Sequence, residues 1–345
     1  MRPLPLSLFL MISCYTICQG QNKTAILKKA TSEGETTIIS RGPSSIARTI
    51  KQDRKGNIWI ASWEGVFRYD GKSFVNITKD VSSARFFSVL EDRKGNFWFA
   101  SVGSGVYYYD GNTFENFTSK DGLSSDRVTN IYEDKNGIIW FGTEGGASRY
   151  DGKSFQNYRM NGTLSEDFKN DDNDVNSIIE DKSGKFWFGT RGNACVYDGK
   201  KFVVVTHNGK PFTNVRTIIE DRKGNIWLGG KDGLWRYDGT TFSNFTTNFV
   251  GYIYEDKKEN VWISSVSANH QGWALSRYDK ESLYRSIFIN GWVIKPAAKE
   301  IKSNERMIFG ILEANDESIW FGTLNGVSHY NGKTFTNFNS EGTTK

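Results

Sequence analysis

The heptapeptide DRKGNIW occurs twice in this 345-residue chain, at Asp53–Trp59 and again at Asp221–Trp227. Related strings end at five further tryptophans: Trp98, Trp140, Trp187, Trp262 and Trp320. Successive tryptophans of this set of seven are separated by 39, 42, 47, 40, 35 and 58 residues. A unit that recurs about every 40 residues is typical of a solenoid or a propeller.

Each unit divides into four short apolar runs separated by turn residues. In the fifth unit the runs are VRTIIED at 215–221, NIWLGG at 225–230, GLWRYD at 233–238 and TTFSNFT at 240–246. Asp-x-x-Gly-Asn after the first run favours a type I turn followed by a left-handed glycine, and Asp-Gly after the third run is a hairpin signal. Runs of about five residues rich in β-branched and aromatic side chains predict one four-stranded antiparallel sheet.

Seven such units predict an all-β fold, a seven-bladed β-propeller of four-stranded antiparallel blades over residues 46–345. A stacked solenoid would need polar caps on its end repeats, whereas the first and last units here keep their apolar pattern. Adjacent apolar residues in the first strands, such as Ile218 and Ile219, indicate blades that are covered on both faces. The expected architecture is therefore a closed ring.

Crowding near the axis of such a ring requires small side chains in the first strands. Thr217 of the fifth unit and Gly310 of the seventh occupy one equivalent position, and Tyr252 is the exception there. Units six and seven also depart from the turn motif, because Glu259 and Glu317 replace its glycine and Ala314 replaces its aspartate. These two blades are expected to have the least regular turns.

The point at which the ring closes is ambiguous in the sequence. Residues 35–40 match the fourth run of a unit, although residues 334–338 already supply the outer strand of the last blade. We expect the N-terminal segment, residues 21–45, to carry a latch strand that pairs with the last blade. The sequence PAAKEIKS at 296–303 is the only helix-like run in the repeat region.

Residues 1–20 predict an export signal. Arg2 precedes an apolar stretch that is shorter than the roughly 20 residues of a membrane span. Two processing routes fit equally: cleavage before Gln21, or lipidation at Cys14, whose surroundings resemble a lipobox. The expected location is periplasmic, secreted or on the outer membrane as a lipoprotein, with no transmembrane span and a lipid anchor at most.

Charge and cysteine content narrow the partners further. The formal net charge of +5 comes from lysines and arginines scattered through turns, so a nucleic-acid partner is not expected. Cys195 is the only cysteine after the signal, which leaves no internal disulfide. Because Cys195 shares its position with Phe67, Tyr107 and Trp235, we assign that position to the blade interior.

Variation among the seven units predicts where a ligand would bind. Turns between strands one and two and between strands three and four are short and uniform. Connections between strands two and three, and from strand four to the next unit, vary in length and sequence. In a propeller these variable connections lie on one face, around one mouth of the central channel. We assign Trp63, Trp273 and Trp292 to these variable connections. Their indoles either stack on a sugar or a peptide, or plug loops against the ring.

Basic residues form a second candidate group at the same mouth. Arg48 and Arg216 occupy equivalent positions in their first strands, and Arg85 and Arg127 are expected one position earlier in theirs. Converging guanidinium groups suit a carboxylate or a sulfate. The alternative is that the arginines are solvated and pair with acidic loop residues, Asp174 or Glu166.

Metal and catalytic signals are weak. Residues 170–174 (NDDND) resemble a calcium loop but lack its glycine and its distant glutamate, so we interpret them as a solvated acidic insertion. The three histidines, His207, His270 and His329, have no metal-ligand spacing. We therefore expect no metal, cofactor or catalytic residue, and retain His270, in the 267–273 loop, as a ligand-binding candidate.

The stretch DGLSSDRVTNIYEDKNGIIWFGT at 121–143 closely resembles the two-component regulator propeller repeat, and all seven units match that repeat in part. The resemblance implies an extracytoplasmic sensor propeller, often followed in the family by a transmembrane helix and a histidine kinase, frequently in bacteria that degrade polysaccharides. This chain has neither the helix nor the kinase. Any sensing is therefore expected to act through a partner.

Three functional hypotheses follow. The first is an exported, non-enzymatic ligand-binding or sensing propeller that recognises a glycan or a protein on its variable-loop face. The second is a metal-dependent propeller lyase or hydrolase resembling streptogramin B lyase, in which His270 would be the catalytic candidate. The third is a surface scaffold for protein–protein interactions.

Overall fold

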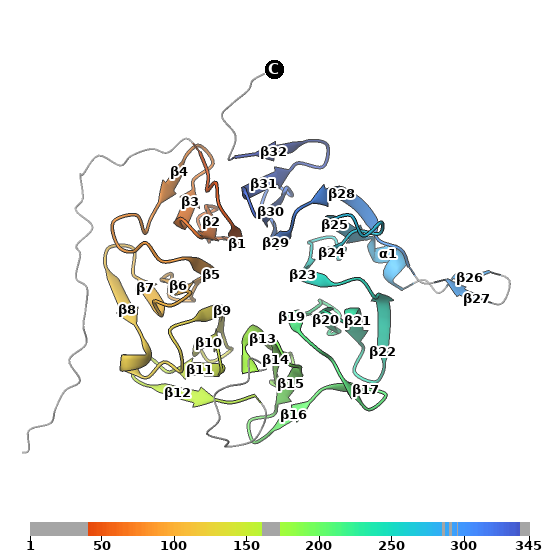
Figure 1. The fold of residues 1–345 in the computed structure, drawn as a ribbon, viewed down its shortest axis with the longest axis horizontal. Helices are drawn as coiled ribbons and strands as arrows, with labels where there is room; N and C mark the ends of the chain where they lie inside the picture. Colours follow the sequence, from red (N-terminus) through yellow and green to blue (C-terminus); the bar gives the residue numbers. More distant parts are fainter. Residues whose placement is uncertain (1–40, 161–172, 285–286, 290–291, 295, 339–345) are drawn as a thin grey trace, which may run out of the picture.

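The computed structural model describes residues 41–160, 173–284, 287–289, 292–294 and 296–338. These residues contain seven four-stranded antiparallel sheets arranged as a ring around a central axis (Figure 1). In six of these sheets the four strands are consecutive in the chain, and in the sixth blade the hairpin β26–β27 lies between the third and fourth strands. In every blade the first strand lies nearest the axis. The predicted seven-bladed β-propeller is confirmed.

The first four blades follow the repeat units in order. Their strands are β1 (Ala47–Gln52), β2 (Ile58–Ser62), β3 (Gly65–Tyr69) and β4 (Phe74–Asn76); β5 (Phe86–Glu91), β6 (Phe97–Ser101), β7 (Val106–Tyr109) and β8 (Phe114–Phe117); β9 (Val128–Glu133), β10 (Ile139–Thr143), β11 (Gly146–Tyr150) and β12 (Phe155–Tyr158); β13 (Val175–Glu180), β14 (Phe186–Thr190), β15 (Ala194–Tyr197) and β16 (Phe202–Val204). A 3-10 turn, η1 (Ser119–Asp121), links blades two and three.

The last three blades follow in the same order, and blade six carries a long insertion between its third and fourth strands. Their strands are β19 (Val215–Glu220), β20 (Ile226–Gly230), β21 (Gly233–Tyr237) and β22 (Phe242–Thr246); β23 (Val250–Glu255), β24 (Val261–Val266), β25 (Trp273–Tyr278) and β28 (Lys299–Glu305); β29 (Ile308–Glu313), β30 (Ile319–Thr323), β31 (Gly326–Tyr330) and β32 (Phe335–Asn337). The additional elements are the hairpins β17 (Thr206–His207) with β18 (Lys210–Pro211) and β26 (Ile287–Ile289) with β27 (Trp292–Ile294), and the helix α1 (Lys280–Leu283).

The repeated heptapeptide is a hydrogen-bonded turn whose tryptophan belongs to the blade core. Trp227 is 0% exposed. One oxygen of the buried Asp221 accepts from the backbone N–H groups of Lys223 (3.0 Å) and Asn225 (2.8 Å). The other accepts from the Asn225 amide (2.7 Å) and the Trp227 indole (2.9 Å). The motif thus joins turn and core, which is why each blade needs its own copy.

The same aspartate–tryptophan bond recurs in five other blades, at 2.8–3.1 Å. The pairs are Asp53–Trp59, Asp92–Trp98, Asp134–Trp140, Asp181–Trp187 and Asp256–Trp262. In the last blade Ala314 stands in the aspartate's place, as the sequence shows.

Acid should weaken the fold through these turns. Burial alone would raise the pKa of Asp53, but hydrogen bonds from Trp59 and Asn57 outweigh it and hold the pKa below its ordinary value of 3.8. The pKa of Asp181 is lowered by the same balance. A carboxylate with a lowered folded-state pKa stabilises the fold above its unfolded-state pKa and loses that contribution as the pH falls. We expect the free energy of unfolding to fall below about pH 4, as measured by urea titrations.

Comparison with Asp53→Asn tests the cause. That variant should be less stable at neutral pH and should lose less stability in acid, because one of the titrating carboxylates is gone. Five exposed hairpin aspartates, whose pKa is also lowered, act in the same direction and remain in the variant: Asp70, Asp110, Asp151, Asp198 and Asp238. An identical acid response in both proteins would contradict the role given to Asp53.

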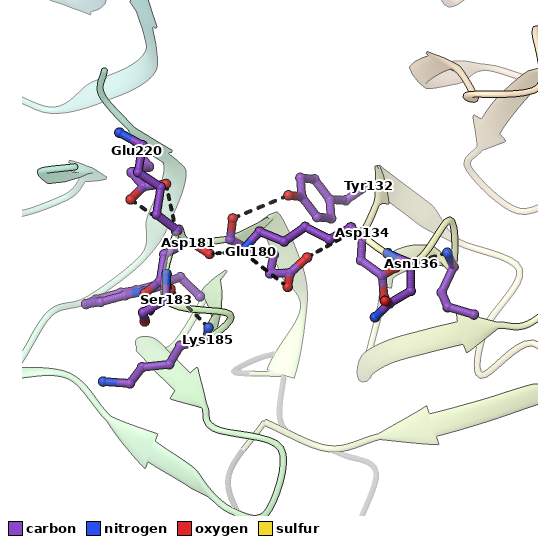
Figure 2. A network of polar contacts seen from close by, with 12 residues as sticks. Tyr132, Asp134, Asn136, Glu180, Asp181, Ser183, Lys185 and Glu220 are labelled. Atoms are coloured by element: carbon purple, nitrogen blue, oxygen red, sulfur yellow. Dashed lines mark hydrogen bonds and ion pairs between the residues drawn. The ribbon is translucent and has the colours of Figure 1, made fainter. Parts of the chain in front are cut away.

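Neighbouring blades are joined by a second repeated contact. The last residue of a first strand accepts a hydrogen bond from the turn of the preceding blade, as Glu180 does from the Lys135 backbone N–H (2.8 Å) (Figure 2). In return the Lys135 ammonium donates to the Asp181 carbonyl (2.6 Å). The backbone-to-carboxylate contact also joins Arg54 to Glu91, Arg93 to Glu133, Lys182 to Glu220, Arg222 to Glu255 and Lys257 to Glu313.

The seam between the last and first blades uses a neutral version of this contact. The Asn315 backbone N–H donates to Oε1 of Gln52 at 2.8 Å. Gly42 also donates to the Phe338 carbonyl (3.2 Å), and Phe338 stacks on Trp320 with 5.1 Å between ring centroids. β32 supplies the outer strand of the last blade, as residues 334–338 predicted. The latch strand expected at residues 35–40 lies outside the described residues.

Two expectations for blade six are wrong. Within the helix-like run 296–303, residues from Lys299 onward belong to the strand β28, because the free edge of β25 needs a backbone partner and tertiary pairing overrides helix propensity. The connection between strands three and four is also long here, since α1 and the β26–β27 hairpin lie between β25 and β28. The hairpin projects outward from the ring (Figure 1).

The register of two arginines also differs from expectation. Arg48 is the second residue of β1, and Arg216 is the second residue of β19. Arg85 and Arg127 lie just before β5 and β9, and therefore two positions earlier rather than one.

The glutamates that replace turn glycines adopt the left-handed conformation. Glu317 has φ 65° and Glu259 has φ 64°, where other blades have glycine, such as Gly224 with φ 86°. We expect Glu317→Gly to be more stable than Glu317→Ala by about 1 kcal/mol, because only glycine adopts this φ without steric cost. Urea unfolding of the two variants, which both lack the ion pair with Lys258, measures the difference. Gly224→Ala is the matched control and should lose a similar amount.

Candidate functional site

A cavity of about 490 Å³ opens at one mouth of the central channel. It is lined by the second residue of every first strand, a set that we call the mouth ring: Arg48, Phe87, Thr129, Asn176, Arg216, Gly251 and Phe309. These strands surround the axis in Figure 1. All seven blades therefore contribute to one cavity.

Both of the variable kinds of connection, between strands two and three and between one blade and the next, border this cavity. Val102, Glu144 and Arg191 come from connections between strands two and three, and Asp174 lies just before a first strand. Backbone hydrogen bonds tie the two kinds together, for example from Arg191 N–H to the Asp174 carbonyl (2.9 Å). The opposite mouth carries the uniform turns, so the antiparallel strand order alone separates a variable face from a constant one.

Four arginines line the cavity, and two of them form ion pairs there. Nε of Arg127 lies 3.0 Å from a Glu144 carboxylate oxygen. Nη1 of Arg191 lies 3.7 Å from a carboxylate oxygen of Asp174. Within the part of the chain that the structure describes, Arg48 and Arg216 have no carboxylate within 4.0 Å.

Arg48 is held in an apolar setting. Its guanidinium carbon lies 4.3 Å from the ring centroid of Phe87 and 4.1 Å from that of Phe309. Burial, and then repulsion from Arg216, lower the pKa of Arg48 to about 10. The pKa of Arg216 is lowered by burial and by Arg191, with Asp174 acting in the opposite direction. Since a pKa near 10 still leaves the group protonated at neutral pH, the cavity is cationic.

Trp273 fills a gap in the mouth ring. A Cβ atom built on Gly251 would lie 2.7 Å from Cζ3 of Trp273, so the absence of a side chain at Gly251 makes room for the indole. Trp273 is half-buried, lines the cavity and packs edge-on against Phe249, with 5.7 Å between centroids. Blade six therefore places the indole of Trp273, the first residue of its third strand, over the space that Gly251 leaves open.

The remaining predicted site residues are not brought to the cavity. Trp63 is half-buried in the strand two–three connection of blade one, beneath the Arg85 guanidinium at 4.6 Å, and does not line the cavity. Trp292 begins β27, which belongs to the connection between strands three and four of blade six. It is therefore not part of a variable connection at the mouth, and its side-chain position is not described. His270 is exposed with φ 58° and also lies outside the cavity lining.

Four further cavity residues were missed in the sequence. Phe87 and Phe309 enclose Arg48, and Asn130 and Tyr252 also line the cavity. Burial raises the pKa of Tyr252 to about 12. A signal for the phenylalanines exists in the sequence. The second position of the seven first strands holds residues of different chemistry, whereas the first and fourth positions are uniformly apolar. That comparison would have identified the whole mouth ring.

The described residues contain neither a cluster of metal-ligating side chains nor a membrane-spanning helix. No group of three or more His, Cys, Asp or Glu side chains there could hold a metal ion, and no histidine lines the cavity. Burial raises the pKa of the Cys195 thiol to about 12. Among the described helices, none is long and apolar enough to cross a membrane.

Four stretches of the chain match the model of the two component regulator propeller family: residues 41–64, 122–145, 171–192 and 209–232. The chain therefore carries repeats of this family, as the stretch at 121–143 predicted. No curated protein matches the chain.

Solved structures with the same fold include domains of different kinds. The extracellular domains of two putative regulators from B. thetaiotaomicron, a hybrid two component system and a one component system, align with TM-scores of 0.67 and 0.62 at 21% and 19% identity. The alignments cover 90% and 86% of this chain but only 41% and 40% of those domains. Virginiamycin B lyase from Staphylococcus aureus, determined with quinupristin, aligns with a TM-score of 0.62 at 15% identity, covering 83% of this chain and 95% of the lyase.

Proposed function

We propose that this protein is an exported, non-enzymatic sensing propeller that binds a glycan or a protein segment in the cavity at the mouth ring. One observation carries the proposal. A single structural position, repeated seven times, holds Arg, Phe, Thr, Asn, Arg, Gly and Phe around one cavity, whereas the first and fourth positions of the same strands are buried and apolar. Folding requires the apolar positions but gives no reason for this chemical variety.

The comparisons support the sensing part of this proposal. The family repeats and the two extracellular regulator domains are what an exported sensor would resemble. A sensor of this kind would pass its signal to a partner protein, and a lipid anchor at Cys14 would hold it at the membrane surface. Fractionation of cells, with and without the Cys14→Ala change, tests the anchor.

Two other functions are distinguishable from sensing. The fold of virginiamycin B lyase allows a lyase, but the two cavity carboxylates near basic residues, Glu144 and Asp174, are both ion-paired, which does not favour general acid–base chemistry. A surface scaffold would bind a protein without responding to small ligands. Metal-dependent turnover of a bound compound would support the enzyme, and binding to a protein alone would support the scaffold.

A bound ligand should raise the melting temperature and should depend on Trp273. A ligand that binds only the folded state stabilises it, so a thermal-shift screen against neutral and acidic oligosaccharides and peptides is the first measurement. For any ligand found, we expect Trp273→Ala to lower the affinity about thirtyfold, because loss of a central aromatic anchor costs at least about 2 kcal/mol.

The matched control is Lys72→Ala, in the strand three–four hairpin of blade one, on the opposite face. It should leave the affinity unchanged. If Lys72→Ala weakens binding as much as Trp273→Ala, the ligand binds the other face and the proposed site is wrong.

A further inference from the structure

The environment of Arg48 restricts how a ligand can approach its guanidinium group. Phe87 covers one side at 4.3 Å and Phe309 lies at 4.1 Å, so the aromatic rings take up the space over the guanidinium carbon. What remains for hydrogen bonding is the edge, where the N–H groups point outward in the plane. Nε of Arg48 is buried and has no hydrogen-bond partner in the described part of the chain. The edge of the Arg48 guanidinium therefore carries the N–H donors that a ligand could reach.

Among the described residues, the four arginines of the cavity lining outnumber its two carboxylates. Glu144 is paired with Arg127 and Asp174 with Arg191, which leaves Arg48 and Arg216 as two cations without a carboxylate partner among the described residues. In the described part of the chain, the Arg216 side chain makes one hydrogen bond, at 3.3 Å to the Asn176 amide oxygen. Arg48 is half-buried and Arg216 is exposed. Two cations that face one cavity repel each other, and an anion bound between them relieves that repulsion.

The lining also holds an acceptor without a donor. Oδ1 of Asn130 is buried and has no hydrogen-bond partner in the described part of the chain. A buried acceptor of this kind requires a donor, such as a hydroxyl group of a ligand. Trp273 adds a half-buried indole at the same cavity, which suits the apolar face of a sugar ring.

We infer that the mouth ring binds a saccharide that carries a carboxylate, such as a uronic acid. The carboxylate lies in the plane of the Arg48 guanidinium and accepts hydrogen bonds from its edge, with Arg216 on its other side. A planar carboxylate suits an edge between two rings better than a tetrahedral sulfate, because its two oxygens lie in the plane of the donors. This inference rests on the proposed function and names its ligand class.

Calorimetry and thermal shift with defined sugars test the inference. The probes are D-glucuronate and D-galacturonate, with D-glucose, D-galactose and D-glucose 6-sulfate as matched compounds. We expect the uronates to raise the melting temperature and to bind about 10- to 100-fold more tightly than the neutral sugars, since charge-assisted hydrogen bonds of this kind contribute that much. The sulfate should rank below the uronates.

Variants separate the geometry of Arg48 from its charge. Arg48→Gln should lower uronate affinity by the same 10- to 100-fold, and Arg48→Lys, which keeps the charge but loses the planar edge, by about tenfold. Arg216→Gln, at a more exposed position, gives a second test if Arg48→Gln perturbs folding. Arg85→Gln is the control, because Arg85 is an arginine near the same mouth that stacks on Trp63 and does not line the cavity.

The outcomes distinguish this inference from the proposed function. If glucose and glucuronate bind equally and both depend on Trp273, the carboxylate is not recognised and the proposed function still stands. Uronate binding that survives both Arg48→Gln and Arg216→Gln would also overturn the inference. If no saccharide or peptide binds at the mouth ring, both are wrong.

Discussion

Replacing Trp227 with alanine is expected to destabilise the protein by about 3–5 kcal/mol, the usual cost of truncating a fully buried tryptophan. Trp227 is 0% exposed and packs on Phe245 with 4.8 Å between ring centroids. Its indole N–H donates to the buried Asp221 carboxylate at 2.9 Å. The change therefore leaves a cavity between blades five and six and removes one donor from a buried carboxylate. Urea or thermal unfolding of the purified protein measures the loss.

A second tryptophan of the same blade provides the control. Trp235 is only half-buried and donates to the Asp232 carbonyl, so Trp235→Ala should cost clearly less than Trp227→Ala. An unchanged free energy of unfolding in Trp227→Ala would show that the repeated tryptophan is not part of the blade core. Equal losses for the two variants would show that burial does not set the cost.

The sequence predicts the fold well because its strongest signals are local and repeated. An aspartate, a glycine and a tryptophan at fixed spacing determine a turn and the start of a buried strand, and the structure shows the aspartate–tryptophan bond in six blades. Seven copies of a local rule leave little freedom in the strand order. The last blade keeps the fold without this bond, since Ala314 is buried in the core of the seam.

Blade six shows where local signals fail. The run at 296–303 has helix propensity, yet from Lys299 onward it pairs with β25, because a tertiary edge decides its conformation. Trp292 was assigned to the variable face because the insertion around it was not recognised as a strand three–four connection. Without the strand pairing, a long segment gives no sign of which two strands it joins.

The candidate site was predictable only in part for a related reason. Arg48, Arg216 and Trp273 were identified by residue type and position. Their arrangement depends on contacts between residues far apart in the chain, such as Arg48 of the first blade and Phe309 of the last. Sequence position alone does not show that two phenylalanines enclose an arginine, or that Gly251 leaves space for an indole from another connection.

The second large loss of stability is expected from a change at Gly310, in the seam between the last and first blades. A Cβ atom at this position would lie 2.3 Å from the Arg48 carbonyl oxygen and 3.2 Å from the Ile50 backbone nitrogen. Other blades tolerate Ser88 or Ser177 at the equivalent position, so the requirement for glycine is specific to the seam. We expect Gly310→Ala to destabilise the protein by about 3 kcal/mol, because the clash is with backbone and a flexible side chain cannot relieve it. Thermal and urea unfolding measure the loss.

Hydrogen exchange shows whether this loss comes from the seam. The Asn315 amide, bonded to Gln52 across the seam, should exchange much faster in Gly310→Ala. The Lys135 amide, bonded to Glu180 between blades three and four, makes the equivalent contact away from the seam and should change little. Equal acceleration of both amides would indicate general unfolding and would contradict a local seam. Because Arg48 belongs to the seam and to the mouth ring, the same variant should also weaken ligand binding, whereas Glu317→Gly, in the turn at the other end of the last blade, should not.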